Sequence, residues 1–441
     1  MMVFLLLSSS QPMAQSKTAF VQLTGIIKGF NNQAEVEDMS EYQYLLPPTA
    51  DRVIIPDTAG HFKIRFQLPS PGYFRLGRNI LYLSPGDNLQ VFIDKADPRK
   101  AIFKGSGEIA NSYLRFTPFP KGGSYIEAGS KAQRTAEGTI DVLLAAASSR
   151  TKQLDSIRSE VTPEFFRLET ARIKADLINS FHAGNISFYR PRKMAQDSLD
   201  RYTKIYAQKS ESMSKAYGNG FVDASLLKLV VYRDLVEELS QQPGSKKDIQ
   251  QMRDWIKATD LIDEMKKISD KKLLTVFKAR VDSIQTVSYK NAVLTNLKSL
   301  LQFGKGDKAV DFTAIDNTGK LVALSSLKGK IIYIDLWATW CGPCMAEMPH
   351  YDSLKASYAS NPNIVFLSLS IDDDIPAWKS NIAKRNATGY QWVINRAKLS
   401  AYNIVGIPRT LLIDKSFTIL DMNGPLPSSK NLPAILGKLD E

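Results

Sequence analysis

The stretch IIYIDLWATWCGPC, residues 331–344, contains both cysteines of this 441-residue chain. It opens as a nearly continuous apolar run, which is typical of a parallel strand that is buried on both faces. The residues after Cys341 favour a helix over about 342–358, with Gly342 and Pro343 at its start. Strand and helix patterns go on alternating around this stretch, so residues 303–441 are expected to form an α/β domain.

The place of the two cysteines at a helix start predicts redox chemistry. A helix N-terminus offers unpaired N–H groups and a positive dipole end, which lower a cysteine pKa from about 8.5 to as little as about 3.5–7.5. Cys341 is therefore the expected attacking thiolate, and Cys344, one turn further along, is expected to resolve the mixed disulfide. A zinc site needs four ligands, but the chain has no other cysteine and its three histidines are scattered, so we expect no metal.

The motif Trp340-Cys341-Gly342-Pro343-Cys344 after an apolar strand resembles the active site of thioredoxin. The resemblance implies a thiol–disulfide oxidoreductase that works without a cofactor, through a redox-active disulfide between Cys341 and Cys344. It also implies that Trp340, Gly342 and Pro343 contact a protein or peptide disulfide substrate.

The resemblance extends to residues outside the motif. Asp335 matches the buried acid of thioredoxins, which takes a proton from the resolving cysteine and whose pKa is raised by burial. Ile407 and Pro408 match the cis-proline loop, where Ile407 is expected to bind an extended substrate strand through main-chain hydrogen bonds. Pro349 matches the proline that kinks the active-site helix. A solvated Asp335 and an ordinary trans turn at Pro408 are the structural alternatives.

Within the thioredoxins, the chain is more similar to the TlpA/ResA-like branch of membrane-facing, periplasmic reductases. Residues 311–330 resemble the N-terminal extension of that branch, and residues 375–392 resemble its inserted element. Glu347 stands where the branch carries an active-site acid, and it either tunes the cysteines or is an exposed helix residue. Residues 366–370 lack the lysine that cytosolic thioredoxin carries near the buried acid, so the proton relay is expected to differ in detail.

The first two thirds of the chain predict two further parts. Residues 18–112 contain short strand-like runs between turn signals, which indicate an antiparallel, β-sandwich-like domain. This segment resembles an uncharacterised domain often found before such thioredoxin domains in exported bacterial proteins. Residues 113–300 show helical spacing instead and are expected to form a central helical region. The strands are expected at 20–25, 53–55, 62–66, 81–83 and 89–93, and the helices at 151–184, 194–216, 221–240 and 246–300.

Residues 1–17 resemble the remnant of a signal peptide, because a short apolar run leads to the small residue Ala14. A basic n-region is missing, and a frayed hydrophobic tail is the alternative. The signal favours the periplasm or cell envelope, and no apolar run long enough for a transmembrane helix follows. The formal net charge is +12, but basic residues alternate with acids, as around Asp270, which favours a solvated face over a nucleic-acid or anionic-lipid site.

The leading hypothesis is an exported reductase of protein disulfides. A Gly-Pro dipeptide between the cysteines is typical of reducing thioredoxins, whose reduction potentials are about −270 mV. Such an enzyme needs a membrane-embedded or periplasmic electron donor. One alternative is a peroxiredoxin-like thiol peroxidase, although Trp340 stands where the peroxidatic pattern has Thr or Ser. The other is an envelope binding protein with a redox-inert thioredoxin fold.

Overall fold

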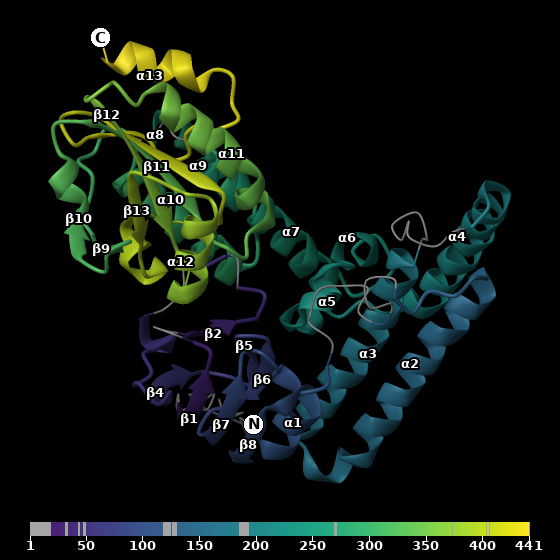
Figure 1. Ribbon diagram of the computed structural model, residues 1–441. Coiled ribbons are helices and arrows are strands. Elements are labelled where there is room, and N and C mark those ends of the chain that lie inside the picture. Colours follow the sequence, from purple (N-terminus) through teal and green to yellow (C-terminus); the bar gives the residue numbers. More distant parts are fainter. Residues whose placement is uncertain are drawn as a thin grey trace, which may run out of the picture.

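Figure 1 shows a computed structural model of the chain, with sheets at the N-terminus, helices in the middle and a mixed sheet with helices at the C-terminus. The prediction for residues 1–17 lies outside the described residues. The structure describes residues 19–440 except 31–33, 43–44, 47–49, 118–124, 126–129, 185–193, 269–270, 373, 403 and 405.

Two four-stranded sheets form the N-terminal part, in the orders β4-β1-β7-β8 and β3-β2-β5-β6. One apolar cluster combines Val21 and Leu23 of the first sheet with Phe74 and Leu81 of the second, so the sheets pack face to face. The strands are β1 (Ala19–Lys28), β2 (Ala34–Asp38), β3 (Val53–Ile54), β4 (His61–Leu68), β5 (Gly72–Leu76), β6 (Asn79–Leu83), β7 (Asn88–Asp94) and β8 (Ile102–Gly105).

The prediction of a wholly antiparallel arrangement is wrong for one pair, because β1 and β7 run parallel. The chain passes to the second sheet between β4 and β7, and it returns to the first sheet in the direction of β1. Three strands were not expected from the sequence. β2 reads AEVED and contains three acidic residues. Because acidic residues are uncommon in strands, this sequence does not predict one.

The helical part contains more breaks than its sequence pattern predicts. Thr162 caps α3 by accepting from the backbone N–H of Phe165, with Pro163 in the first turn. Buried Asp254 accepts from the N–H groups of Gln285 and Thr286 at 3.0 and 2.7 Å, and thereby holds the turn before α10. The continuous helices expected at 151–184, 221–240 and 246–300 are therefore wrong. The helices are α1 (Glu108–Leu114), α2 (Ala136–Ser156), α3 (Pro163–Ala183), α4 (Gln196–Gly218), α5 (Val230–Arg233), α6 (Val236–Leu239), α7 (Lys246–Lys266), α8 (Lys271–Leu274), α9 (Phe277–Asp282) and α10 (Val287–Gln302).

The N-terminal sheets pack directly on these helices, and both contribute to one apolar core. The ring of Tyr82 in β6 lies 4.9 Å from that of Phe165 in α3. Beside them, the fully buried Glu169 accepts from the Tyr73 hydroxyl at 2.6 Å and pairs with Arg172 at 2.9 Å. A buried charge of this kind is tolerated only with such partners, so the contact fixes the sheets on α3.

The C-terminal part is a seven-stranded sheet with the order β10-β9-β13-β12-β11-β14-β15. The central β11 is buried along its whole length, as its apolar sequence predicts, and runs parallel to β12 and antiparallel to β14. The elements are β9 (Thr313–Asp316), β10 (Leu321–Ala323), β11 (Ile331–Trp337), α11 (Gly342–Ser357), β12 (Ile364–Ser370), α12 (Ile375–Lys384), β13 (Tyr390–Val393), β14 (Arg409–Ile413), β15 (Ile419–Asp421) and α13 (Leu432–Asp440).

Helices cover both faces of this sheet. Tyr351 of α11 and Leu432 of α13 pack with Tyr333 on one face, and Trp378 of α12 packs with Ile334 on the other. The segment 375–392 forms α12 and most of β13, which joins the sheet between β12 and β9. This arrangement places the start of α11 at the carboxyl end of β11, where the two cysteines lie.

Candidate active site

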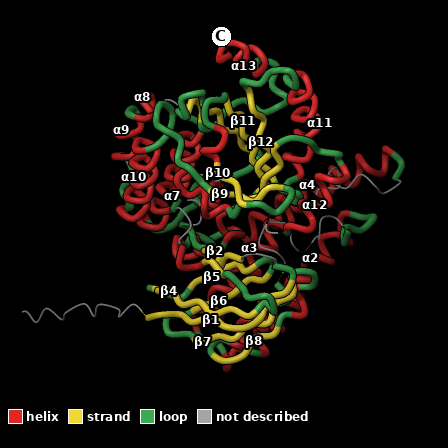
Figure 2. Tube along the Cα trace, turned by 60° about the vertical axis from the view of Figure 1, so that its left-hand side comes forward, coloured by secondary structure: helices red, strands yellow, loops and turns green. Residues whose placement is uncertain are grey.

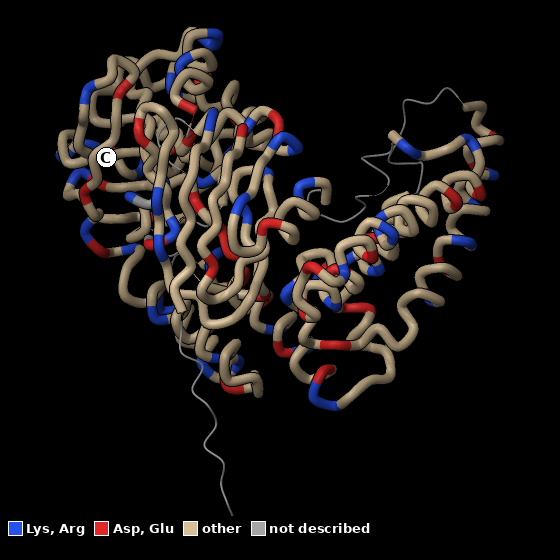
Figure 3. Tube along the Cα trace, turned by 90° about the horizontal axis from the view of Figure 1, so that it is seen from below, with Lys and Arg blue, Asp and Glu red and all other residues tan. Residues whose placement is uncertain are grey.

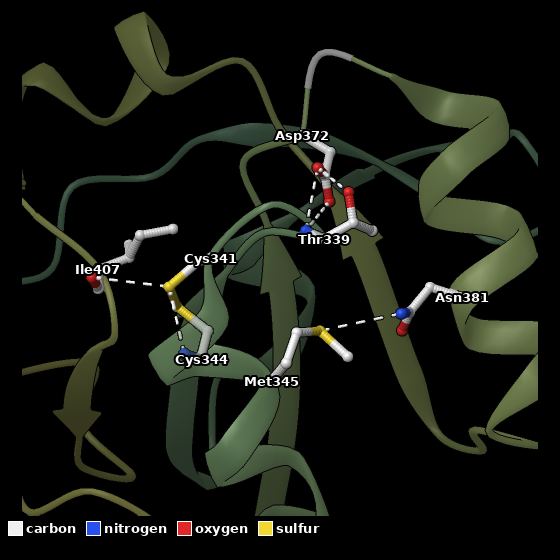
Figure 4. The surroundings of a disulfide bond; sticks show 7 residues. All are labelled: Thr339, Cys341, Cys344, Met345, Asp372, Asn381 and Ile407. Atoms are coloured by element: carbon white, nitrogen blue, oxygen red, sulfur yellow. Dashed lines mark hydrogen bonds between the residues drawn. A yellow bond between two sulfur atoms is a disulfide. The ribbon is translucent and has the colours of Figure 1, made fainter. Parts of the chain in front are cut away.

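The two cysteines form a disulfide at the start of α11 (Figure 4). Cys341 is the N-cap residue of this helix, and its Sγ accepts from the backbone N–H of Cys344 at 3.2 Å. Pro343 occupies the first turn, where a missing N–H costs nothing. Cys341 keeps 6% of its surface exposed and Cys344 only 1%, so Cys341 is the sulfur that is easier to reach from solvent.

A second loop comes against Cys341 from the other side. The Ile407–Pro408 peptide bond is cis. The carbonyl oxygen of Ile407 lies 3.8 Å from Cys341 Sγ, as Figure 4 shows. The residues that flank Cys341 are open to solvent, with Trp340 65% exposed and Gly342 also exposed. The fold thus brings the two sequence-predicted substrate segments, 340–343 and 407–408, together around one sulfur.

Asp335 lies in β11 and is 1% exposed. Among the described residues, neither of its carboxylate oxygens has a hydrogen-bond partner. Burial, with a smaller contribution from the negative charge of Glu347, raises the pKa of Asp335 from 3.8 to about 7. The solvated alternative for Asp335 is therefore wrong, and this carboxyl changes its charge near neutral pH.

Glu347 projects from the second turn of α11 and is held by one residue of the segment before α13. Its Oε2 accepts from the backbone N–H of Ser428 at 2.9 Å, and its Oε1 accepts from the Ser428 hydroxyl at 2.8 Å. Both oxygens of Glu347 are thus engaged, whereas no described residue donates to either oxygen of Asp335. The two carboxylates of the site therefore occupy opposite environments.

The sequence analysis missed Asp372, which holds the approach to the cysteine motif. Its buried carboxylate accepts from the backbone N–H of Thr339 at 2.9 Å and from the Thr339 hydroxyl at 2.7 Å (Figure 4). It also accepts from the hydroxyl of Ser370 at 2.8 Å. The signal was present, since β12 ends at Ser370 and Asp372 follows two residues later, and carboxyl ends of parallel strands meet at one edge of a sheet.

Arg385 was missed as well, and it supplies a cation near the buried acid. Its Nη2 pairs with Asp352 of α11 at 2.9 Å, and its guanidinium carbon lies 5.4 Å from the centre of the Trp337 ring. Its positive charge acts against burial by lowering the pKa of Asp335. Arg385 directly follows α12, so this cation comes from a different element than residues 366–370.

Neither a metal site nor a membrane span is found among the described residues. They contain no group of three or more His, Cys, Asp or Glu side chains arranged to hold a metal ion. No helix in the same part of the chain combines the length and the apolarity needed to cross a bilayer.

Comparison with known proteins places this site in a family. Residues 304–424 match the Redoxin family model. The thiol-disulfide oxidoreductase ResA of a Bacillus cereus strain is 30% identical over 126 residues, which are 28% of this chain and 70% of the relative. This chain belongs to the ResA-like thiol–disulfide oxidoreductases of the thioredoxin superfamily. The sequence prediction of a TlpA/ResA-like thioredoxin fold at the C-terminus is thereby confirmed.

Another relative and a solved structure match a share of the chain of similar size. The thioredoxin-like protein YneN of Bacillus subtilis is 27% identical over 134 residues, 30% of this chain and 79% of YneN. The crystal structure of a candidate thiol-disulfide oxidoreductase from Bacteroides vulgatus is 38% identical, covers 31% of this chain and 96% of its own, and has a TM-score of 0.30. The Redoxin model matches residues 304–424, in the C-terminal part of the chain. The family assignment therefore says nothing about what the sheets and helices upstream do.

Proposed function

We propose that this oxidoreductase reduces protein disulfides, with Cys341 as the attacking thiolate and Cys344 as the resolving thiol. The observation that carries the proposal is the position of Cys341, which caps α11 and lies 3.8 Å from the Ile407 carbonyl while Cys344 is buried behind it. The helix N-terminus stabilises a thiolate at Cys341. Burial disfavours a charged thiolate at Cys344 until a base removes its proton.

The reaction then proceeds in two exchanges. The Cys341 thiolate attacks one sulfur of the substrate disulfide, which breaks the substrate S–S bond and releases the first substrate thiolate. Cys344 next gives its proton to Asp335 and attacks Cys341 Sγ, which forms the enzyme disulfide and releases the second substrate thiolate. Two electrons pass from the enzyme dithiol to the substrate, and a separate donor must restore the dithiol.

Asp335 is suited to the second exchange, because it is buried and its pKa lies at about 7. A base whose pKa is near the working pH both accepts and returns a proton readily. Glu347 acts on Asp335 through its charge in this proposal, because both of its own oxygens are engaged by Ser428. It is therefore a positioning and tuning group rather than the proton acceptor.

Substrate binding is assigned to the exposed rim of the site. An extended segment of the substrate is expected to lie along Ile407 and Pro408 through main-chain contacts, a form of strand addition. The exposed Trp340, Gly342 and Pro343 form the other side of the rim. Backbone contacts carry little side-chain selectivity, which suits a general substrate class of protein disulfides.

The direction and compartment belong to the same proposal. The Gly-Pro dipeptide supports a reductase, and an apolar run within residues 1–17 supports export to the periplasm or cell envelope. A donor in or near the membrane would then supply electrons. Equilibration with a glutathione buffer measures the reduction potential of the disulfide and so tests whether the protein is a reductase. We expect about −270 mV, and a value of about −120 mV would indicate an oxidant.

Insulin reduction with dithiothreitol as donor tests the chemistry. We expect activity from the wild type, none from Cys341→Ser, and a stalled covalent complex with substrate from Cys344→Ser. The double variant Cys341→Ser/Cys344→Ser is the matched control, and it should form no such complex. Activity retained by Cys341→Ser, or a complex formed by the double variant, would overturn the assignment.

A further inference from the structure

Exposed apolar side chains gather in one segment of the helical part. Fifteen large apolar residues are exposed in the described part of the chain, and five of them lie within residues 271–302, a span of only 32 residues. Scattered exposed apolar residues are ordinary, but a concentration of them marks an interaction surface. The five are Leu273, Val276, Val287, Leu294 and Leu301.

Three of these residues form a row along α10. Val287, Leu294 and Leu301 are spaced by seven residues, or about two helical turns, so they lie on one side of the helix. Their exposed fractions are 69%, 37% and 39%. The opposite side of α10, with Tyr289 and Val293, is buried in the core of the helical part. Packing within the fold thus accounts for one apolar side of α10 and leaves the other exposed.

Basic residues outnumber acids in the same segment, although three of them are ion-paired: Lys271 with Asp307, Arg280 with Glu264 and Lys290 with Asp282. Residues 271–302 contain six basic residues and a single acid, Asp282, which gives them +5 of the net +12 of the chain. Lys290 and Lys298 each lie four residues from Leu294, so they flank the apolar row on the same side of α10. Lys278 and Lys298 are exposed and form no salt bridge with another described residue. Figure 3, which views the molecule from below, shows Lys and Arg interspersed with Asp and Glu along the chain.

We propose that this surface docks on a bilayer rich in anionic phospholipids. We define the α8–α10 face by Leu273, Val276, Val287, Leu294 and Leu301 with Lys278, Lys290 and Lys298. An apolar row flanked by lysines suits the boundary between headgroups and acyl chains, where the apolar side chains are buried and the lysine ends reach the phosphates. For this segment the proposal replaces the sequence prediction of a merely solvated face.

The charge argues against a second copy of the chain as the occupant. Two copies that meet through this face would bring a surface of net positive charge against another of the same sign, which costs free energy. An anionic lipid surface reverses that sign. Figure 2 shows α8, α9 and α10 beside the C-terminal sheet, at the side away from α11. A bilayer on the α8–α10 face therefore leaves the side that carries α11 turned away from the lipid.

The test measures binding of the full chain to vesicles. Vesicles of phosphatidylcholine with about 30 mol% phosphatidylglycerol and vesicles of phosphatidylcholine alone are compared by co-sedimentation at about 0.1 M salt, where exposed charges still act. We expect binding to the anionic vesicles only. A lysine near an anionic surface changes the affinity about fivefold, so Lys278→Gln/Lys298→Gln is expected to weaken binding by about 20- to 30-fold.

Matched control variants test whether binding depends on the residues of this face or on any exposed lysine or apolar residue. Lys152→Gln/Lys204→Gln removes two exposed lysines from α2 and α4 and should bind as the wild type does. Leu294→Ser/Leu301→Ser should weaken binding, whereas Ile102→Ser, at an exposed position of β8, should not. Disulfide reduction by all these variants should be unchanged, so the outcome is independent of the thiol chemistry.

Three outcomes overturn the proposal. The first is the absence of binding to anionic vesicles, and the second is an equal loss of binding in the control and test lysine variants. The third is self-association of the wild type in analytical ultracentrifugation that Leu294→Ser/Leu301→Ser abolishes, which would make the face an interface between copies.

Discussion

Replacing Asp335 by Asn separates the two exchanges of the proposed reaction. Asn keeps the shape of the side chain but cannot accept the proton of Cys344. The attack of Cys341 on substrate needs only a thiolate favoured by the start of α11, so formation of the mixed disulfide should change little. Loss of a general base costs about 10²- to 10⁴-fold, so the resolving step should slow by that factor. Stopped-flow kinetics across pH 5–9 resolve the two steps.

The same substitution should stabilise the protein above neutral pH. The pKa of Asp335 is raised from 3.8 to about 7 by burial, so between these values the folded protein holds a proton that the unfolded chain has released. The associated stability is complete below pH 3.8 and is lost as the pH rises through 7. A shift of about three units corresponds to about 4 kcal/mol. Asp335→Asn should therefore unfold at higher urea than the wild type at about pH 8.5, and at similar urea near pH 4.

Tryptophan fluorescence follows this unfolding, because four of the five tryptophans lie within 303–441. Glu347→Gln is the matched control in the kinetics, since Glu347 is the competing acid of the site. It should shift the pH profile of the resolving step to lower pH without removing the step, because its charge helps to raise the pKa of Asp335. If Asp335→Asn leaves that profile unchanged while Glu347→Gln abolishes the step, the base is Glu347 and our assignment is wrong.

Three further outcomes are expected. In the reduced protein, iodoacetamide at neutral pH should label Cys341 well before Cys344, which is 1% exposed, and mass spectrometry that finds equal rates would contradict the assigned roles. Residues 303–441 alone should fold and reduce insulin, because every site residue lies within them. Circular dichroism and the insulin assay check this. An unfolded or inactive fragment would show that α7–α10 complete the site. Asp372→Ala should lower the free energy of unfolding by about 1–3 kcal/mol, because the N–H and hydroxyl of Thr339 lose a buried acceptor; an unchanged urea midpoint would show that water replaces the carboxylate.

The site was largely predictable because its chemistry is local in sequence. The strand, both cysteines and the helix start fall within fourteen residues, 331–344, and each agrees with the others. Ile407 and Asp335 entered through the family resemblance, and the fold brings Ile407 to Cys341. Asp372 and Arg385 act through contacts between elements far apart in the chain. No local pattern predicts the contact of Arg385, whereas the position of Asp372 two residues after a buried strand was a signal that went unused.

The fold upstream was predicted less well for a related reason. Helical spacing over 246–300 shows which residues are apolar, but it does not show where the helix stops. The break before α10 depends on Asp254, which lies 31 and 32 residues before the two N–H groups that it accepts from. The strand β2 is held in its sheet by pairing with β5, although its acidic sequence opposes a strand. Tertiary contacts override local preference in both cases.

The contrast between Asp335 and Glu347 explains why one acidic residue of this site suits proton transfer and the other does not. Asp335 has lost water and gained no hydrogen bond from a described residue, so its charged form is costly, and its proton is exchanged near pH 7. Both oxygens of Glu347 instead accept hydrogen bonds from Ser428. The negative charge of Glu347 adds to burial in raising the pKa of Asp335. In the proposed reaction the resolving step requires this unpartnered burial, which costs stability, so removing the carboxylate should improve the fold above neutral pH and impair the reaction together.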